Sequence, residues 1–184
     1  MLYLTQQASP VGQLTLVSDG DRLKGLWMED NPFFLSALKG QSLQNDPGLP
    51  LFARVKNWLE RYFAGQKPML TGFDLAPHAT PFQAIVYELL SKIAYGQSIS
   101  YGELAKQTAK RLGKPKMSAQ AVGQALGRNP IAIIIPCHRV LSANGGLTGY
   151  AAGLARKLFL LRLEGCDVAS FSRKLKQPFP SRNR

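Results

Sequence analysis

A cysteine and a histidine stand next to each other in the hexapeptide at residues 135–140, Ile-Pro-Cys-His-Arg-Val. A thiol attacks as its thiolate, and a free cysteine has a pKa of about 8.5. A neighbouring imidazole that accepts the proton would therefore make Cys137 a nucleophile at neutral pH. Free cysteine is among the most often buried residue types, so a structural thiol beside a surface histidine fits the pair alone equally well.

The residues before Cys137 indicate how the thiol is held. Residues 131–135 form an apolar run, which predicts a buried strand. Pro136 has a fixed φ and favours an extended Ile135, so the cysteine would leave this strand on a stiff support. A first helix is expected to begin at Pro81 after the cap Thr80, and its spacing places three apolar residues on one face: Ile85, Leu89 and Ile93.

The next two expected helices form a helix-turn-helix pattern. Ser100 and Glu103 fit a capping box at the start of one helix, residues 113–115 break it, and Ser118 can cap another that runs to about Arg128. This third helix has small residues at alternate positions: Ala119, Ala121, Gly123, Ala125 and Gly127. It could pack closely against a neighbouring helix or approach a narrow nucleic-acid groove. The second alternative is favoured by adjoining basic residues: Lys106, Lys110, Arg111, Lys114 and Lys116.

A last helix is expected from Gly153 to Glu164, with Leu154, Leu158 and Leu161 facing inward. The same spacing places its three basic residues outward: Arg156, Lys157 and Arg162. The first third of the chain predicts short strands at 2–4, 14–17 and 23–27, a loop at 39–50, a helix that ends near Gly65 and a linker at 74–80. We therefore expect an α/β domain at 1–78, a mainly α domain at 79–170 and a basic, disordered tail at 171–184.

The net charge of +12 is confined to one part of the 184-residue chain. Residues 1–78 carry seven basic and seven acidic residues, whereas the remainder carries sixteen basic and four acidic ones, and 16 − 4 = 12. This asymmetry favours a polyanion such as nucleic acid over solubility alone or an anionic membrane. No stretch predicts a transmembrane helix or a signal peptide. Two cysteines and no zinc-binding spacing predict a reduced, cytoplasmic protein without a metal.

Several short motifs accompany the Cys-His pair in a fixed order. The chain has A-V-G-Q-A at 121–125, N-P at 129–130, I-P-C-H-R-V at 135–140, G-Y-A-A-G at 149–153 and L-E-G at 163–165. This order resembles the O6-alkylguanine-DNA alkyltransferases over residues from about 80 to 165. The resemblance implies an N-terminal domain that is ribonuclease H-like and a C-terminal domain that is like a winged helix-turn-helix.

The resemblance also implies a reaction that consumes the protein. Cys137 would take the alkyl group from guanine O6, or from O4-alkylthymine, as a stable thioether, without a cofactor. His138 would accept the thiol proton through a water, Glu164 would orient the imidazole, and Tyr101 would donate to the leaving guanine. Because a base inside a duplex cannot reach such a thiol, a monomer would act on a nucleotide flipped out through the minor groove of double-stranded DNA.

Further positions follow from the same resemblance. Those assigned to substrate binding are Asn129, Val140, Tyr150, Ala151 and Ala152, and those assigned to DNA are Ser100, Lys116, Gln120, Ala121, Gly123 and Arg128. Gln120 departs from the family, which has an arginine there that fills the space of the flipped base. Three alternatives stay open at this point: a lesion-binding module without catalysis, a cysteine hydrolase and a helix-turn-helix regulator.

Overall fold

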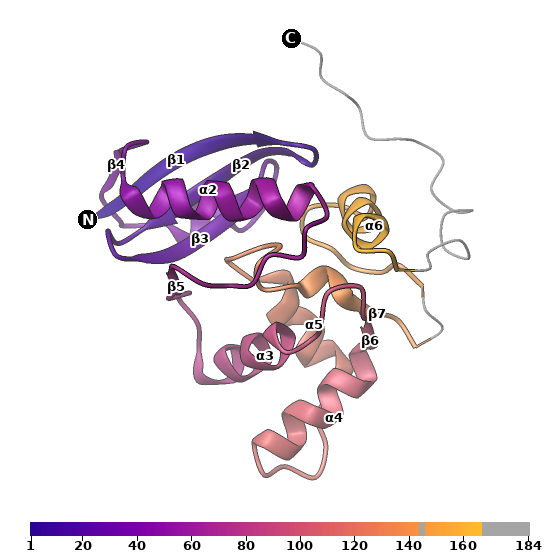
Figure 1. Ribbon diagram of the computed structural model, residues 1–184. Helices are drawn as coiled ribbons and strands as arrows, with labels where there is room; N and C mark the ends of the chain where they lie inside the picture. Colours follow the sequence, from indigo (N-terminus) through magenta and orange to yellow (C-terminus); the bar gives the residue numbers. More distant parts are fainter. Residues whose placement is uncertain (144–145, 167–184) are drawn as a thin grey trace.

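A computed structural model describes residues 1–143 and 146–166 of the chain. Figure 1 shows a sheet with one long helix lying over it and, beside it, a half built mainly of helices. The predicted basic tail at 171–184 lies outside the described residues.

The sheet is built on a three-stranded antiparallel meander. Its strands are β1 (Leu2–Ser9), β2 (Gly12–Ser18) and β3 (Arg22–Met28), which confirms the three predicted strands. Two short strands add in parallel at the edges: β4 (Leu43–Asn45) pairs with β1, and β5 (Asp74–Leu75) pairs with β3. The prediction of a plain loop at 39–50 and a linker at 74–80 was wrong at these two short strands. The outer strands of the meander have unpaired backbone groups, and the two segments form hydrogen bonds with them.

Helix α2 (Pro50–Phe63) lies over one face of the sheet (Figure 1) and confirms the predicted helix. Its first residue is a proline, and the buried side chains recur at helical spacing: Leu51, Phe52, Val55, Leu59 and Tyr62. The four-residue helix α1 (Phe34–Ala37) was not predicted, because it is too short for a periodic pattern.

Three helices begin the second half: α3 (Pro81–Ser91), α4 (Tyr101–Arg111) and α5 (Ala119–Gly127). Their N-caps are the predicted Thr80, Ser100 and Ser118. The complete capping box is at Thr80 and Gln83, whereas the Glu103 side chain accepts a hydrogen bond from Gln107 instead of closing a box with Ser100.

The buried face of α3 differs from the predicted one. Val86, Tyr87 and Leu90 are buried, whereas Ile85 and Leu89 are only partly buried. The helix packs against both α4 and α5, so the face turned toward those neighbours is the buried one.

The apolar run at 131–135 is buried but is not a strand. Only Ile131 pairs, as an isolated bridge with Leu26 of β3. The chain then turns back on itself: the Ile135 amide donates to the Ile131 carbonyl at 3.0 Å, and Ile133 has a φ of 68°. Hydrophobicity predicted the burial correctly, but it could not distinguish a strand from a buried turn.

Cys137–Arg139 form one 3₁₀ turn, which leads into β7 (Val140–Leu141). This strand pairs in parallel with β6 (Ile99–Ser100), directly before α4. The last described helix is α6 (Leu154–Leu163). Arg162 is exposed as predicted, but Arg156 and Lys157 are buried, because both reach carbonyl groups inside the protein.

One hydrophobic core joins the two halves. It runs from strand residues such as Leu26, through Val55 of α2 and Val86 of α3, to Ile131 and Leu160. The site that contains Cys137 therefore rests on both halves of the chain. In the ranges 1–143 and 146–166, no helix is long and apolar enough to cross a membrane.

Candidate active site

The Cys137 thiol is buried at the start of the 3₁₀ turn, with 7% of the residue exposed. The Asn129 side-chain amide donates to the Cys137 Sγ at 3.2 Å and to the Ile135 carbonyl at 2.8 Å. The Asn129 carbonyl oxygen accepts from the Ile131 amide at 3.1 Å. One asparagine thus holds both ends of the buried turn and contacts the sulfur. Cys137 and Cys166 are both free thiols.

His138 is completely buried next to the thiol. Its Nε2 lies 2.8 Å from Glu164 Oε1, whereas Nδ1 is buried and has no hydrogen-bond partner among the described residues. A carboxylate can only accept, so Nε2 carries the proton and Nδ1 keeps its lone pair. The sequence-predicted base therefore has its acceptor nitrogen free.

Glu164 is the hub of the site. Arg139 donates to both of its carboxylate oxygens, Nε to Oε2 at 2.8 Å and Nη2 to Oε1 at 2.9 Å. The Tyr62 hydroxyl, from α2, donates to Oε1 at 2.6 Å, and the Gly96 amide donates to Oε2 at 3.3 Å. This buried carboxylate is fully satisfied by hydrogen bonds, and those to His138 and Arg139 hold its pKa well below the usual range although burial opposes them.

Burial acts on both members of the Cys-His pair. It raises the pKa of the Cys137 thiol, and it lowers the pKa of His138 despite the neighbouring Glu164 carboxylate. The imidazole is therefore neutral at pH 7 and able to accept a proton. The thiol, by contrast, needs stabilisation of its anion, which the Asn129 amide and the positive charge of Lys157 provide.

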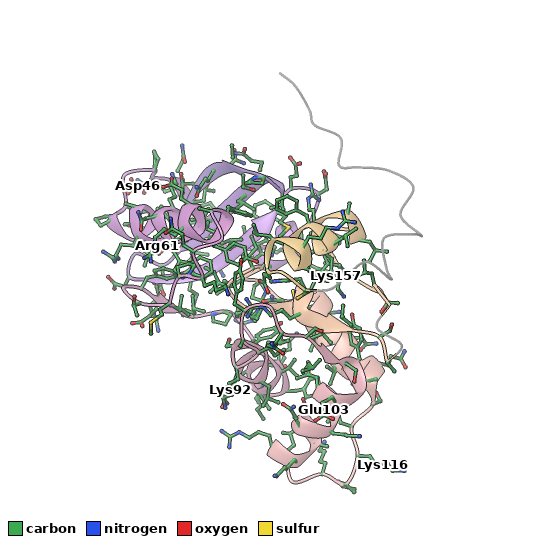
Figure 2. The ribbon with its side chains drawn as sticks, turned by 45° about the vertical axis from the view of Figure 1, so that its right-hand side comes forward. Asp46, Arg61, Lys92, Glu103, Lys116 and Lys157 are labelled. Carbon is green, nitrogen blue, oxygen red and sulfur yellow. The ribbon has the colours of Figure 1, made fainter. Side chains whose placement is uncertain are left out.

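Lys157 was predicted to face outward, yet it is fully buried beside the site. Its Nζ donates to the Val140 carbonyl at 2.7 Å and to the Thr148 carbonyl at 3.0 Å, and it lies 5.7 Å from the centre of the Tyr101 ring. Figure 2 shows its position on α6. Burial lowers the pKa of Lys157 to about 8, while the Cys137 thiolate acts in the opposite direction.

Two tyrosines from the sequence-predicted set flank the thiol. The Tyr101 hydroxyl donates to the carbonyls of Thr148 and Gly149, each at 3.1 Å, and burial raises its pKa. The Tyr150 hydroxyl is buried beside Cys137 and makes no hydrogen bond to an oxygen or nitrogen atom in the described part of the chain. Its pKa is raised by burial and by the neighbouring Cys137. Ala151 and the buried Ala152 follow Tyr150 in the same loop.

The residues expected to contact DNA lie around α5. Gln120 and Arg128 are exposed near its two ends, and Ala121 and Gly123 are partly buried between them. Lys116 is exposed in the segment before α5, at the edge of the molecule far from the sheet (Figure 2), and the partly buried Ser100 caps α4. Among the described residues, none of these side chains forms a hydrogen bond to the Cys137 thiol.

Comparison with known proteins identifies this arrangement. Residues 81–166 match the family model of the 6-O-methylguanine DNA methyltransferase, DNA binding domain, and residues 2–77 match that of its ribonuclease-like domain. The chain belongs to the 6-O-methylguanine DNA methyltransferase family. The fold is thus the two-domain fold of this family, with an N-terminal domain of sheet and helix and a helical C-terminal DNA-binding domain.

Members of this family from distant organisms are similar over most of their length. The methylated-DNA–protein-cysteine methyltransferase of Methanosarcina acetivorans is 43% identical and is covered to 99%, with 89% of this chain aligned. Its counterpart from Haemophilus influenzae is 40% identical, with 86% of it and 89% of this chain covered. The crystal structure of Mycobacterium tuberculosis OGT in complex with DNA matches with a TM-score of 0.76 and 40% identity, over 88% of this chain and 92% of that one.

Four buried residues of the 6-O-methylguanine DNA methyltransferase site were missed by the sequence analysis as site residues: Tyr62, Arg139, Arg156 and Lys157. Arg139 belongs to the hexapeptide and could have been noticed as the partner of a buried acid. Arg156 and Lys157 are adjacent in a helix that also carries Arg162, and the helical spacing fits all three on a broad polar face, so it gave no signal that two of them are buried. Tyr62 carries no such signal, because an aromatic residue at helical spacing in α2 reads as core.

Proposed function

We propose that this protein repairs DNA by moving the alkyl group of O6-alkylguanine onto Cys137. The thiolate sulfur forms a bond with the alkyl carbon while the bond from that carbon to O6 breaks, and guanine leaves. The product thioether is stable, so each molecule acts once. The observation that carries this proposal is the buried Cys137 thiol between the Asn129 amide and a neutral His138 fixed by Glu164.

The proton of the thiol has a defined destination in this proposal. His138 Nδ1, buried and unpartnered among the described residues, accepts it through a water, and the imidazolium that forms is stabilised by Glu164. Tyr101 donates to the guanine as negative charge develops on its ring. In the structure the Tyr101 hydroxyl donates to Thr148 and Gly149, so it must exchange these carbonyls for the base.

The guanine itself is recognised by the loop and strand beside the thiol. The carbonyls of Cys137 and Val140 accept from the exocyclic amine, the Ala151 amide donates to O6, and Tyr150 walls the pocket next to Ala152. The Val140 carbonyl already accepts from Lys157, but a carbonyl oxygen has a second lone pair for the base.

The duplex approaches through α5, which enters the minor groove so that the damaged nucleotide flips out. Two of its glycines support this proposal, because the protein leaves room for a side chain at both. A Cβ at Gly127 would meet nothing within 4 Å, and one at Gly123 would make only ordinary contact, 3.7 Å from the Tyr101 ring. Packing within the protein does not require glycine at either position, whereas close approach to a groove does.

We further propose domain boundaries at 78 and 170, with a ribonuclease H-like N-terminal domain and a winged helix-turn-helix C-terminal domain. The protein acts as a monomer in the cytoplasm without a cofactor, and Ser100, Lys116 and Arg128 contact DNA. The family-model ranges, 2–77 and 81–166, support the first boundary.

The test is intact-mass analysis after incubation with a duplex that contains O6-methylguanine. We expect the mass of one methyl group per molecule, mapped to Cys137, and no further product after one equivalent. Cys137→Ala should take up nothing, whereas the matched variant Cys166→Ala should react like the wild type. Product formation beyond one equivalent would contradict the proposal and indicate a hydrolase. A methyl group on Cys166 would contradict the assignment of Cys137 as the nucleophile.

A further inference from the structure

Arg156, in the first turn of α6, is a buried arginine that links separate parts of the molecule. Its Nε donates to the Val11 carbonyl at 2.8 Å, its Nη1 to the Ala152 carbonyl at 3.0 Å, and its Nη2 to the Glu29 carboxylate at 3.0 Å. About a tenth of the side chain is exposed, 10% against 44% for Glu29. The proposed chemistry does not use this residue.

The partners of Arg156 in the N-terminal half form a firm anchor. Val11 is fully buried in the turn between β1 and β2, and Glu29 directly follows β3. The Glu29 backbone carbonyl accepts from Arg156 Nη1 as well, at 3.2 Å. Gly12 makes the room for this cluster: a Cβ there would overlap the Glu29 carboxylate and lie 3.3 Å from Arg156 Nη2.

The partner on the other side is the loop expected to contact guanine. Ala152 follows the Tyr150–Ala151 pair, and the Gly153 amide closes the loop by donating to the Tyr150 carbonyl at 2.9 Å. The Arg156 charge also acts on the Tyr150 hydroxyl, since it opposes the rise of the Tyr150 pKa caused by burial. Arg156 thus lies behind the pocket wall and contacts its backbone, away from the sulfur and the alkyl group.

We propose that Arg156 is a positioning residue that fixes the loop Tyr150–Gly153 against the N-terminal half and so sets where O6-alkylguanine sits relative to Cys137. This inference rests on the proposed function. A guanidinium has five donors in a rigid, planar fork and can hold several acceptors at once, which a lysine ammonium on a flexible stem cannot. The N-terminal half then takes part in lesion recognition through the contacts of Val11 and Glu29 with Arg156.

The experiment compares Arg156→Met, which keeps the apolar stem, and Arg156→Lys, which keeps the charge, with wild type. Arg162→Met is the matched control, since it removes an exposed arginine from the same helix. For each protein, the second-order rate of Cys137 alkylation is measured by peptide mapping with three reagents. They are free O6-benzylguanine, a duplex with O6-methylguanine, and iodoacetamide, which needs no guanine pocket.

We expect Arg156→Met to slow both guanine reagents by about 10- to 100-fold, the size of effect that a misplacement of about 1 Å produces. Arg156→Lys should also slow both guanine reagents, but by less, and should leave the iodoacetamide rate unchanged. If Arg156→Met does not fold, Arg156→Lys alone tests the positioning role. Iodoacetamide should react with Cys137 at a rate within about twofold of wild type. Arg162→Met should match the wild type with the free base and with iodoacetamide.

The outcomes separate the two proposals. If wild type takes no alkyl group from either guanine reagent, the proposed function fails. If wild type reacts and both Arg156 variants keep its rates, only the positioning role is overturned. An equal loss with iodoacetamide would also overturn it, because Arg156 would then act on the thiol or on the fold as a whole.

Discussion

At the scale of single residues, the main feature of the site is a set of groups that lower the pKa of a buried thiol. Burial raises the pKa of Cys137, and the groups that oppose it are the Asn129 amide and the Lys157 ammonium. The His138 imidazole cannot supply a positive charge at rest, because burial lowers its pKa and keeps it neutral. Lys157 is therefore the cation expected to favour the thiolate.

This balance predicts a pH dependence. The thiolate fraction rises with pH below the thiol pKa, and Lys157, with a pKa of about 8, supports the thiolate only while it is protonated. In Lys157→Met the pKa of Cys137 should rise by about one unit or more, because an opposite charge is lost. The rate–pH profile for iodoacetamide at Cys137 should then move to higher pH, with about tenfold slower reaction at pH 7. The control is Lys116→Met, which removes an exposed lysine and should leave the rate–pH profile in place. An unshifted profile in Lys157→Met would refute the role of Lys157 in stabilising the thiolate.

At the scale of elements, the glycines of α5 fit the proposal that this helix gives up stability in order to approach DNA closely. Glycine inside a helix costs about 1 kcal/mol relative to alanine, and the structure has room for a methyl group at Gly123. We expect Gly123→Ala to raise the free energy of unfolding by up to about 1 kcal/mol in urea titrations. The rate on duplex O6-methylguanine should nevertheless fall by about tenfold or more, about 1.4 kcal/mol, while free O6-benzylguanine reacts unchanged. A duplex rate that rises with stability would contradict the groove model.

The same helix carries Gln120 at the position where the resemblance implies an arginine. Flipping a base costs a few kcal/mol, and a free base avoids this cost. The shorter, neutral glutamine offsets less of this flipping cost than an arginine would. Gln120→Arg should therefore speed alkyl transfer from the duplex and tighten duplex binding, and it should leave the rate with the free base unchanged. Equal acceleration on both substrates would show that the position acts on reactivity. No change on the duplex would mean that another residue, Arg128 or Lys116, fills the space.

At the scale of the whole molecule, the positive charge divides into structural and exposed groups. Arg139, Arg156 and Lys157 are buried and bind internal acceptors, so they add nothing to phosphate contacts. Several exposed basic residues lie close together on α4 and the segment that follows it: Lys106, Lys110, Arg111, Lys114 and Lys116. These elements form the end of the molecule farthest from the sheet (Figure 1).

Duplex binding should therefore weaken steeply with salt. Each phosphate contact adds about −0.9 to the slope of log affinity against log salt. Lys116→Gln should reduce the magnitude of the slope by about 1, measured by fluorescence anisotropy at several salt concentrations. Lys39→Gln, the same change at an exposed position of the N-terminal half, should leave the slope unaltered. A salt-independent affinity in wild type would contradict binding through phosphates.

The sequence by itself determined the local features of this protein. Caps at Thr80, Ser100 and Ser118, the three strands of the meander and the helix from Pro50 follow from residue types and periodicity over a few positions, which act within one element. The motif around Cys137, with His138 and Glu164, was also found in this way, because its spacings along the chain are fixed.

The tertiary structure decided which groups meet across distant segments. It turned the run at 131–135 into a buried turn held by Asn129, brought Tyr62 from α2 to Glu164, and drew Arg156 and Lys157 inward to carbonyls of other elements. A helical pattern shows only which face each residue occupies. Whether a charge on that face is solvated or buried depends on acceptors that lie up to 145 positions away, at Val11, and only the folded chain brings these together.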